Sequence, residues 1–368
     1  MESNKLKLKE YLKIYIRGLK LFRVLMPWYM TRSAVTALCH AARPLLTLAL
    51  SARLLDELAG ARDLKLIALY AALAVGAGFA LLALSVALSR VNMKDGDYGG
   101  YRAAYYMAMT HRAERFAALD FEHAESSAVN EKLSEIRGYE NWNSYGLVFL
   151  FFRVPSLMKA TLSVAGSLAL LAGMIMSGGA SIATALLLLS PIVPILARIP
   201  FVRAQERLNA EMQKTMPKAN SLYGYFLSTY IHPDKAGKDI RIFNQKAAVM
   251  ERLDRLEFKK SMKAAYKYER VGNAAPSAIN AALGAAAYLV IGLKALAGAF
   301  TIGQVTQYVG ALTSFTQSVG QCASILTELR VNAPFLVMLY EFLDLPDVKY
   351  RGTLTTEKRA DNEYEIEF

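Results

Sequence analysis

Polar residues recur at helical spacing inside a long apolar stretch near the C-terminal end of the sequence. Residues 295–327 contain no Asp, Glu, Lys or Arg. Steps of three and four residues place amide, hydroxyl, glycine and finally acidic positions on one helix face: Gln307, Gly310, Ser314, Gln317, Gln321, Ser324 and Glu328. In a membrane span, such a face lines a water-filled pathway or bonds to neighbouring helices. We interpret it as a candidate substrate pathway, with helix packing as the open alternative.

A second candidate for the pathway lies near the N-terminal end of the sequence. His40 and Arg43 are three residues apart and therefore share a helix face. An unpaired arginine near the middle of a bilayer costs about 2.5 kcal/mol or more. Because no acidic residue lies deep in another apolar segment, we expect Arg43 to face a cavity, bond to backbone or meet an anionic substrate. A position nearer the outer headgroups is the alternative.

The sequence shows no pattern typical of catalysis or metal binding. The four histidines are scattered, and no Cys or Asp cluster has metal-ligand spacing. A phosphate-binding P-loop reads G-x-x-x-x-G-K-[ST]. The nearest pair, Gly237 and Lys238, is followed by Asp239, and His232 stands where the first glycine is required. We therefore expect no catalytic residue, metal, cofactor or ATPase site in this chain.

The apolar content comes in blocks that are long enough to cross a membrane. Of the 368 residues, 54% are hydrophobic, and the mean hydropathy is +0.23. The runs 66–89, 160–197, 271–293 and 295–327 carry no charge, and each exceeds the length of about 20 residues that a membrane-spanning helix needs. The run at 160–197 contains a turn-forming cluster at 177–181 and is divided into two. We predict an all-α membrane protein with six spans, at about 28–55, 65–89, 157–177, 181–201, 276–298 and 302–328.

The basic residues predict how these spans are oriented. The chain has a net charge of +12, and 36 of its 43 lysines and arginines lie in four segments: 1–32, 90–141, 198–270 and 330–368. Positive residues gather on the cytoplasmic side of a membrane. We therefore predict a protein of the plasma membrane with both termini in the cytoplasm. The same charge would attract anionic lipids, and we expect no nucleic-acid partner.

The segments between the spans are also predicted to be helical. Residues 1–23 form an amphipathic helix, with an apolar stripe that includes Leu12 and Phe22, suited to the membrane interface. The connections at about 90–156 and 198–275 are long and charged. In the first we expect two helical arms of about 30 residues, each about 45 Å long, without a strand. A short segment would form the tip of each connection.

This order of elements resembles the six-helix transmembrane domain of ABC exporters. An interfacial elbow helix, six spans and two long loops with coupling tips match that family over residues 1 to about 350. Three motifs support the resemblance: Leu119-Asp120-Phe121-Glu122 is similar to the first coupling region, Lys238 to Phe243 to the turn after the second, and Glu363 to Phe368 to the first strand of the nucleotide-binding domain. The resemblance divides the chain into an elbow at 1–23, a membrane domain at 24–345, and a linker with this strand at 346–368.

The resemblance implies a function and a set of partners. ATP and Mg would bind to nucleotide-binding domains outside these residues, and their closure would drive alternating access for a peptide, lipid or amphiphilic drug. The complete transporter would be an ATP-hydrolysing translocase with a second, identical or different, transmembrane domain, and spans four and five would cross to that partner. Residues at the tips would contact the motor: Asp120, Phe121, Glu122, Glu125, Ser126, Tyr223, Tyr225, Phe226 and Tyr230. A channel or secondary transporter without an ATPase is the alternative function, and a membrane scaffold or sensor is a third.

Overall fold

The computed structural model describes residues 8–93, 96–178, 182–204, 208, 233–254 and 258–346, nearly all of them helical. Six of the helical segments are long and apolar enough to cross a membrane. Their order confirms the prediction of six spans and indicates an integral membrane protein. The spans are α2 (Tyr29–Ala59), α3 (Leu64–Leu88), α7 (Leu147–Gly178), α8 (Ile182–Leu189) with helical residues 192–204, α12 (Phe258–Leu296) and α13 (Ile302–Leu343).

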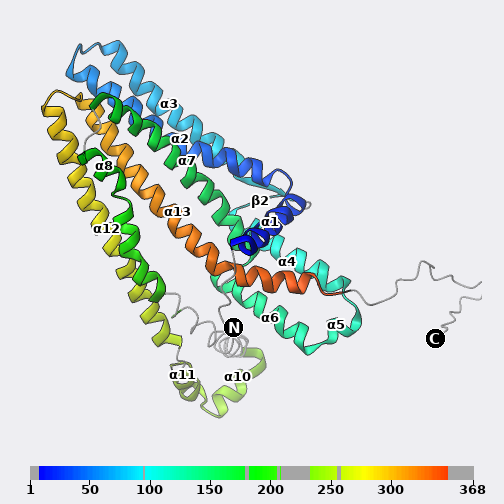
Figure 1. Cartoon of the computed structure of the whole chain (residues 1–368). Helices are drawn as coiled ribbons and strands as arrows, with labels where there is room; N and C mark the ends of the chain where they lie inside the picture. The colour runs from blue at the N-terminus through cyan, green and yellow to red at the C-terminus, as the bar shows by residue number, and fades with distance from the viewer. Residues whose placement is uncertain are drawn as a thin grey trace, which may run out of the picture.

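The six spans form two unequal groups. Helices α2, α3, α7 and α13 pack side by side in an elongated bundle, and α8 lies against α12 beside it (Figure 1). The α12 helix joins α13 through residues 297–301 at one end and diverges from it toward the other. We call the end with residues 297–301 the turn end and the opposite end the arm end.

Glycines allow close packing between α2 and α13. A Cβ atom on Gly303 would lie 2.0 Å from the carbonyl oxygen of Ala52, and one on Gly310 would lie 2.4 Å from a methyl carbon of Leu48. At Gly303 the close atom belongs to the backbone, so only glycine fits there, whereas a larger residue at position 310 would require the Leu48 side chain to move. The small residues therefore set how closely the bundle packs.

Asp56 joins the two helices at the turn end. Its carboxylate accepts hydrogen bonds from the Thr301 hydroxyl at 2.9 Å and from the Gly303 backbone N–H at 2.8 Å. Thr301 and Gln304 also form a capping box at the start of α13. Three otherwise unpaired groups of this helix terminus are thus satisfied by local and cross-helix contacts.

At the arm end a compact apolar core joins six helices. It contains α1 (Leu8–Leu25), which is the predicted elbow segment as a helix, α4 (Gly100–Ala118) and α6 (Ser127–Asn143), together with one end each of α2, α7 and α13. Phe22, Met26 and Phe342 have no exposed surface. Leu12 and Ile16 of α1 remain about half exposed, at 54% and 49%, so part of the apolar face of α1 is free for the membrane interface.

The prediction of two long continuous arms is wrong. The outgoing arm is interrupted by two antiparallel strands, β1 (Arg90–Met93) and β2 (Gly96–Gly99), which pair Arg90 with Gly99, so the expectation of a strand-free connection also fails here. Glycines at 96, 99 and 100 weaken the helix at this point. The α4 and α6 helices have 19 and 17 residues, which is about 28 and 25 Å.

The returning arm also ends before the next span. Ser144 and Gly146 have positive φ angles of 53° and 75°, a conformation that stops a helix. The α7 helix then begins at Leu147, well before the start of span three that the sequence predicts near position 157. The fourth span is interrupted as well, at Ser190 and Pro191, because proline lacks the backbone N–H that continues a helix.

The second long connection is described in part. It contains α10 (Pro233–Ile242) and α11 (Lys246–Asp254), with Asn244 between them at a φ of 46°. The predicted tip residues Tyr223, Tyr225, Phe226 and Tyr230 lie outside the described residues, as does the linker after residue 346 with its predicted strand.

Candidate pathway and motor contact

The polar face of α13 has three different environments along its length. Near the turn end, Gly310 packs against α2. At this position the polar face therefore serves helix packing, which is the alternative to a substrate pathway. In the middle, Gln317 and Gln321 are exposed and Ser314 is half-buried. Gln307, which lies further toward the turn end, is also half-buried. Toward the arm end, the Ser324 hydroxyl donates a hydrogen bond of 2.9 Å to Glu328. The middle of this face is therefore the part that is free to contact a substrate.

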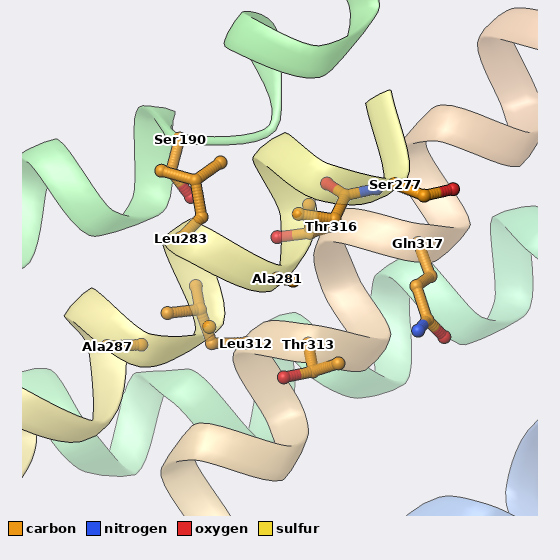
Figure 2. Close-up of a pocket in the computed structure, with 11 residues that line it drawn as sticks. Ser190, Ser277, Ala281, Leu283, Ala287, Leu312, Thr313, Thr316 and Gln317 are labelled. Carbon is orange, nitrogen blue, oxygen red and sulfur yellow. The ribbon is translucent and has the colours of Figure 1, made fainter. Parts of the chain in front are cut away.

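A cavity of about 500 Å³ opens where α12 diverges from α13. Figure 2 shows Ser277 of α12 and Thr313, Thr316 and Gln317 of α13 around it, with Ser190 beyond the end of α8. The remaining lining is one asparagine and five small or aliphatic residues: Asn280, Ala281, Leu283, Gly284, Ala287 and Leu312. This mixture can hold a substrate that has both apolar and hydrogen-bonding parts.

Only Gln317 of the predicted pathway residues lines this cavity. The sequence reasoning missed the contribution of α12, although Ser277, Asn280 and Gly284 recur at steps of three and four. The Asn280 side-chain oxygen is buried and has no hydrogen-bond partner among the described residues. Because an unpaired buried oxygen is costly, it is available to a donor on a bound molecule.

Glu328 is neutralised within the protein. The guanidinium of Arg153 in α7 lies 2.8 Å from its carboxylate and 5.4 Å from the centre of the Phe149 ring. Glu328 therefore joins α13 to α7 and holds Ser324 in place. The sequence reasoning missed Arg153, because the sequence gives no sign that it faces α13.

His40 and Arg43 lie elsewhere, on the surface of α2. Leu45 and Leu48 of the same helix pack against α7 and α13, whereas His40 and Arg43 are exposed. Lys159 of α7 lies close enough for its charge, with that of Arg43, to act on the His40 ring. Lys159 had no role in the sequence prediction.

The first predicted tip is a separate short helix. The α5 helix (Phe121–Glu125) lies between α4 and α6, with Asp120 and Ser126 at its two ends, at the far end of the arm (Figure 1). Phe121 is 75% exposed, and Glu122 and Glu125 are exposed beside it. An exposed aromatic ring is typical of a surface that binds a protein partner.

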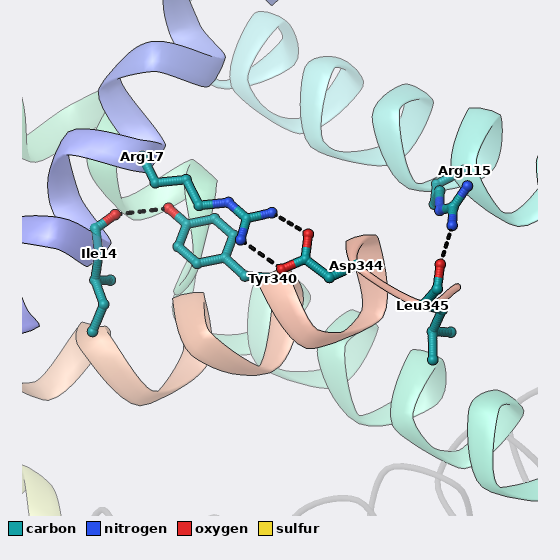
Figure 3. A network of polar contacts seen from close by, with 6 residues as sticks. All are labelled: Ile14, Arg17, Arg115, Tyr340, Asp344 and Leu345. Atoms are coloured by element: carbon teal, nitrogen blue, oxygen red, sulfur yellow. Dashed lines mark hydrogen bonds and ion pairs between the residues drawn. The ribbon is translucent and has the colours of Figure 1, made fainter. Parts of the chain in front are cut away.

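Several charged contacts hold α1 and the arm to the end of α13. Arg17 of α1 binds Asp344 through two contacts of 2.5 and 2.6 Å and lies 4.3 Å from the centre of the Tyr340 ring (Figure 3). Arg115 of α4 donates to the Leu345 carbonyl oxygen. Lys132 of α6 lies 2.8 Å from the Glu341 carboxylate. The position of α5 is therefore tied to the last turns of α13.

A buried ion pair joins the two helices of the arm. Arg112 of α4 and Glu140 of α6 lie 2.7 Å apart and are 5% and 2% exposed. Burial raises the pKa of Glu140 to about 7, and the positive charge of Arg112 opposes this shift. Beside this pair, the buried Asn332 of α13 accepts from the Gly146 N–H at 2.7 Å and donates to its carbonyl oxygen at 3.2 Å.

Among the described residues, no group of three or more His, Cys, Asp or Glu side chains could hold a metal ion. The chain matches no protein-family model, and no curated protein matches it. Its function must therefore be inferred from its own residues and fold.

Proposed function

We propose that the chain is the transmembrane domain of an ATP-driven ABC exporter, which moves a peptide, lipid or amphiphilic drug by alternating access. The observation that supports this most is the arm. A short exposed helix, α5, lies at its far end, and the arm is tied through side-chain contacts to α13. A channel or gradient-driven transporter rarely needs such a lever, whereas a motor outside the membrane does.

The proposed mechanism follows the contacts from the tip inward. ATP-driven closure of nucleotide-binding domains would push on α5, and the Arg112–Glu140 pair would make α4 and α6 move together. The contacts at Lys132 and Arg115 would pass this motion to the end of α13. This helix changes direction in its orange to red part and contains Pro334 (Figure 1), and a proline kink is a natural hinge.

The second transmembrane domain would bind to the group formed by α8 and α12. This pair leaves the bundle toward the arm end (Figure 1), and only 11% of the most apolar stretch of α12 is buried. A helix that is so little covered by its own chain needs lipid or a partner. In this proposal both termini and the arm are cytoplasmic, in agreement with the distribution of basic residues, and the protein lies in the plasma membrane.

Substrate-stimulated ATPase activity tests the proposal. The chain is expressed from its natural gene, and ATP hydrolysis in inside-out vesicles is measured with amphiphiles of both charges. We expect vanadate-sensitive stimulation, most of which is lost in Phe121→Ala and Glu122→Lys because α5 contacts the motor. The control is Glu114→Lys, an exposed position of α4 away from the tip, which should keep the stimulation.

Two results would count against an exporter. Uptake that follows an ion gradient and resists vanadate would support the channel or secondary transporter instead. Full stimulation in both tip variants would show that α5 does not carry the coupling.

A further inference from the structure

We propose that the cavity between α12 and α13 binds an uncharged amphiphile whose headgroup carries O–H or N–H donors, such as a sugar or an amide on an alkyl chain. The claim that this molecule is the transported substrate rests on the proposed function. The binding itself does not, because it depends only on the side chains that line the cavity.

The cavity is polar at one end and apolar at the other. Because α12 runs from the arm end to the turn end and α13 runs back, its arm side holds Ser277, Asn280 and Gln317. Ala287 and Leu312 lie toward the turn end, on the other side of the view in Figure 2. Both are buried in an apolar cluster formed by α7, α8, α12 and α13. An amphiphile would therefore place its hydrocarbon toward the turn end and its headgroup toward the arm end.

The lining favours a headgroup without charge. Among the described residues that line the cavity, none is charged, and the polar groups are all hydroxyls and amides. Burial of an ion that meets no opposite charge costs far more than burial of a hydroxyl or amide that finds a hydrogen-bond partner. A charged amphiphile therefore binds here more weakly than an uncharged one of the same length.

The polar end offers hydrogen-bond acceptors. The hydroxyls of Ser277 and Thr313 donate to carbonyl oxygens of their own helices, those of Asn273 at 2.7 Å and Val309 at 2.9 Å. A hydroxyl whose single donor is used in this way can still accept, and both residues are exposed. The side-chain oxygen of Asn280 is an acceptor without a partner in the described part of the chain. A headgroup that satisfies these oxygens must supply O–H or N–H donors.

A glycine keeps the cavity open. Gly284 lines it, and a Cβ atom on this residue would meet no other atom within 4 Å. The volume of about 500 Å³ lies within the range of sites that hold small molecules. Because the space beside Gly284 is empty, a larger side chain there would fill the cavity without displacing a neighbour.

Binding of octyl glucoside to the full chain tests the inference. The protein is reconstituted in phosphatidylcholine nanodiscs, and binding is measured at concentrations that leave the discs intact, with binding to empty discs subtracted. We expect octyl glucoside to bind roughly tenfold or more tightly than octyl sulfate or octyltrimethylammonium. The same glucoside with its hydroxyls methylated, which lacks donors, should also bind roughly tenfold more weakly.

Three variants locate the site. Asn280→Leu should reduce the difference between the hydroxylated and the methylated glucoside, because it removes an acceptor. Gly284→Leu should abolish binding of octyl glucoside, because the new side chain fills the cavity. The matched control is Gly292→Leu, at another α12 glycine with open space around it that does not line the cavity, and it should bind as the parent does.

The two glycine variants keep the result interpretable. Each replaces a helical glycine that has open space around it with a better helix former, so both should fold and melt at least as well as the parent. A charged probe that binds as tightly as octyl glucoside would overturn the proposal. Equal binding by the two folded glycine variants would overturn it as well.

A second titration identifies the source of the amphiphile. The measurement is repeated in nanodiscs that contain a glycolipid. Loss of octyl glucoside binding would support a membrane lipid as the occupant, and retention would support a single-chain molecule. In an exporter, uncharged amphiphiles should stimulate ATP hydrolysis at lower concentrations than charged ones. Because neither titration uses ATP, failure here leaves the exporter proposal intact, and vanadate-resistant transport leaves the binding site intact.

Discussion

Removal of the buried charge pair between α4 and α6 should be less harmful than removal of either half. Arg112 and Glu140 are 5% and 2% exposed and lie 2.7 Å apart. Loss of one partner leaves the other charge buried alone, which costs about 3–5 kcal/mol. Replacement of both by apolar residues of similar size is typically neutral or stabilising by about 1–4 kcal/mol. We expect Arg112→Met and Glu140→Leu each to lower the thermal stability in detergent and the double variant to restore it.

The pH dependence of stability provides an independent readout of the same pair. Burial raises the pKa of Glu140 from 4.5 in a free side chain to about 7 in the folded protein. A raised pKa for an acid means that the folded state favours the neutral form. The contribution of Glu140 to the free energy of unfolding is therefore fully present below pH 4.5. It is lost as the pH rises toward 7, by about 3 kcal/mol in total.

The melting temperature is therefore measured at a series of pH values, from about 4.5, the pKa of a free glutamate, to above 7, the raised pKa of Glu140. The parent protein should lose stability over this interval through Glu140, and the double variant should lose less. If the double variant is as unstable as the single variants, the pair is a net source of stability and our reasoning is wrong. If the parent and the double variant share one pH profile, the raised pKa is wrong.

Two further predictions concern α13. Gly303→Ala should destabilise the protein by roughly 1–3 kcal/mol, because its Cβ would overlap the Ala52 carbonyl oxygen. Gly320→Ala, which has open space around it, should stabilise the protein by up to about 1 kcal/mol. Thermal unfolding in detergent compares the two variants, and equal melting temperatures would contradict the close approach of α2 and α13. Asn332→Ala should lower the free energy of unfolding by roughly 2–4 kcal/mol, because it leaves the N–H and carbonyl of Gly146 unpaired in a buried position. Hydrogen exchange at the start of α7 should become faster in the same variant. The control Asn273→Ala, at an exposed position, should change neither the stability nor the exchange.

The sequence predicts the membrane spans well because their signal is local. A run without charge needs no knowledge of what lies beside it, and each of the six predicted spans corresponds to a described helix. The tip at Asp120 to Ser126 was also found from local features, since α5 occupies this position. In both cases the composition of a short segment determines its structure.

Contacts between helices were not predictable in the same way. The pairing of Arg153 with Glu328 and the closeness of Lys159 to His40 depend on how α7 is rotated against its neighbours. Hydropathy does not specify that rotation. The hairpin at 90–99 was missed for a different reason, because Gly96, Gly99 and Gly100 weaken a helix but do not specify that paired strands replace it.

The contacts of α13 imply where a proposed motion has to occur. At the turn end this helix is fixed by Asp56 and by the close contact of Gly303 with Ala52. At the arm end Asn332 and the contacts of Glu341 and Leu345 fix it. Between them, the exposed Gln317 and Gln321 make no side-chain hydrogen bond to another helix within the described ranges, and the cavity with α12 opens beside them.

A helix that is held at both ends transmits a push on α5 into its middle. Pro334 lies two residues beyond Asn332, within the fixed arm end, so a bend that changes the width of the cavity without breaking the cap at Asp56 would have to occur between Gly303 and Asn332. The α8–α12 pair is attached to the bundle mainly at the turn end (Figure 1). In an exporter, it would therefore swing about that attachment, and the cavity lined by Gln317 and Asn280 would open and close at the arm end first.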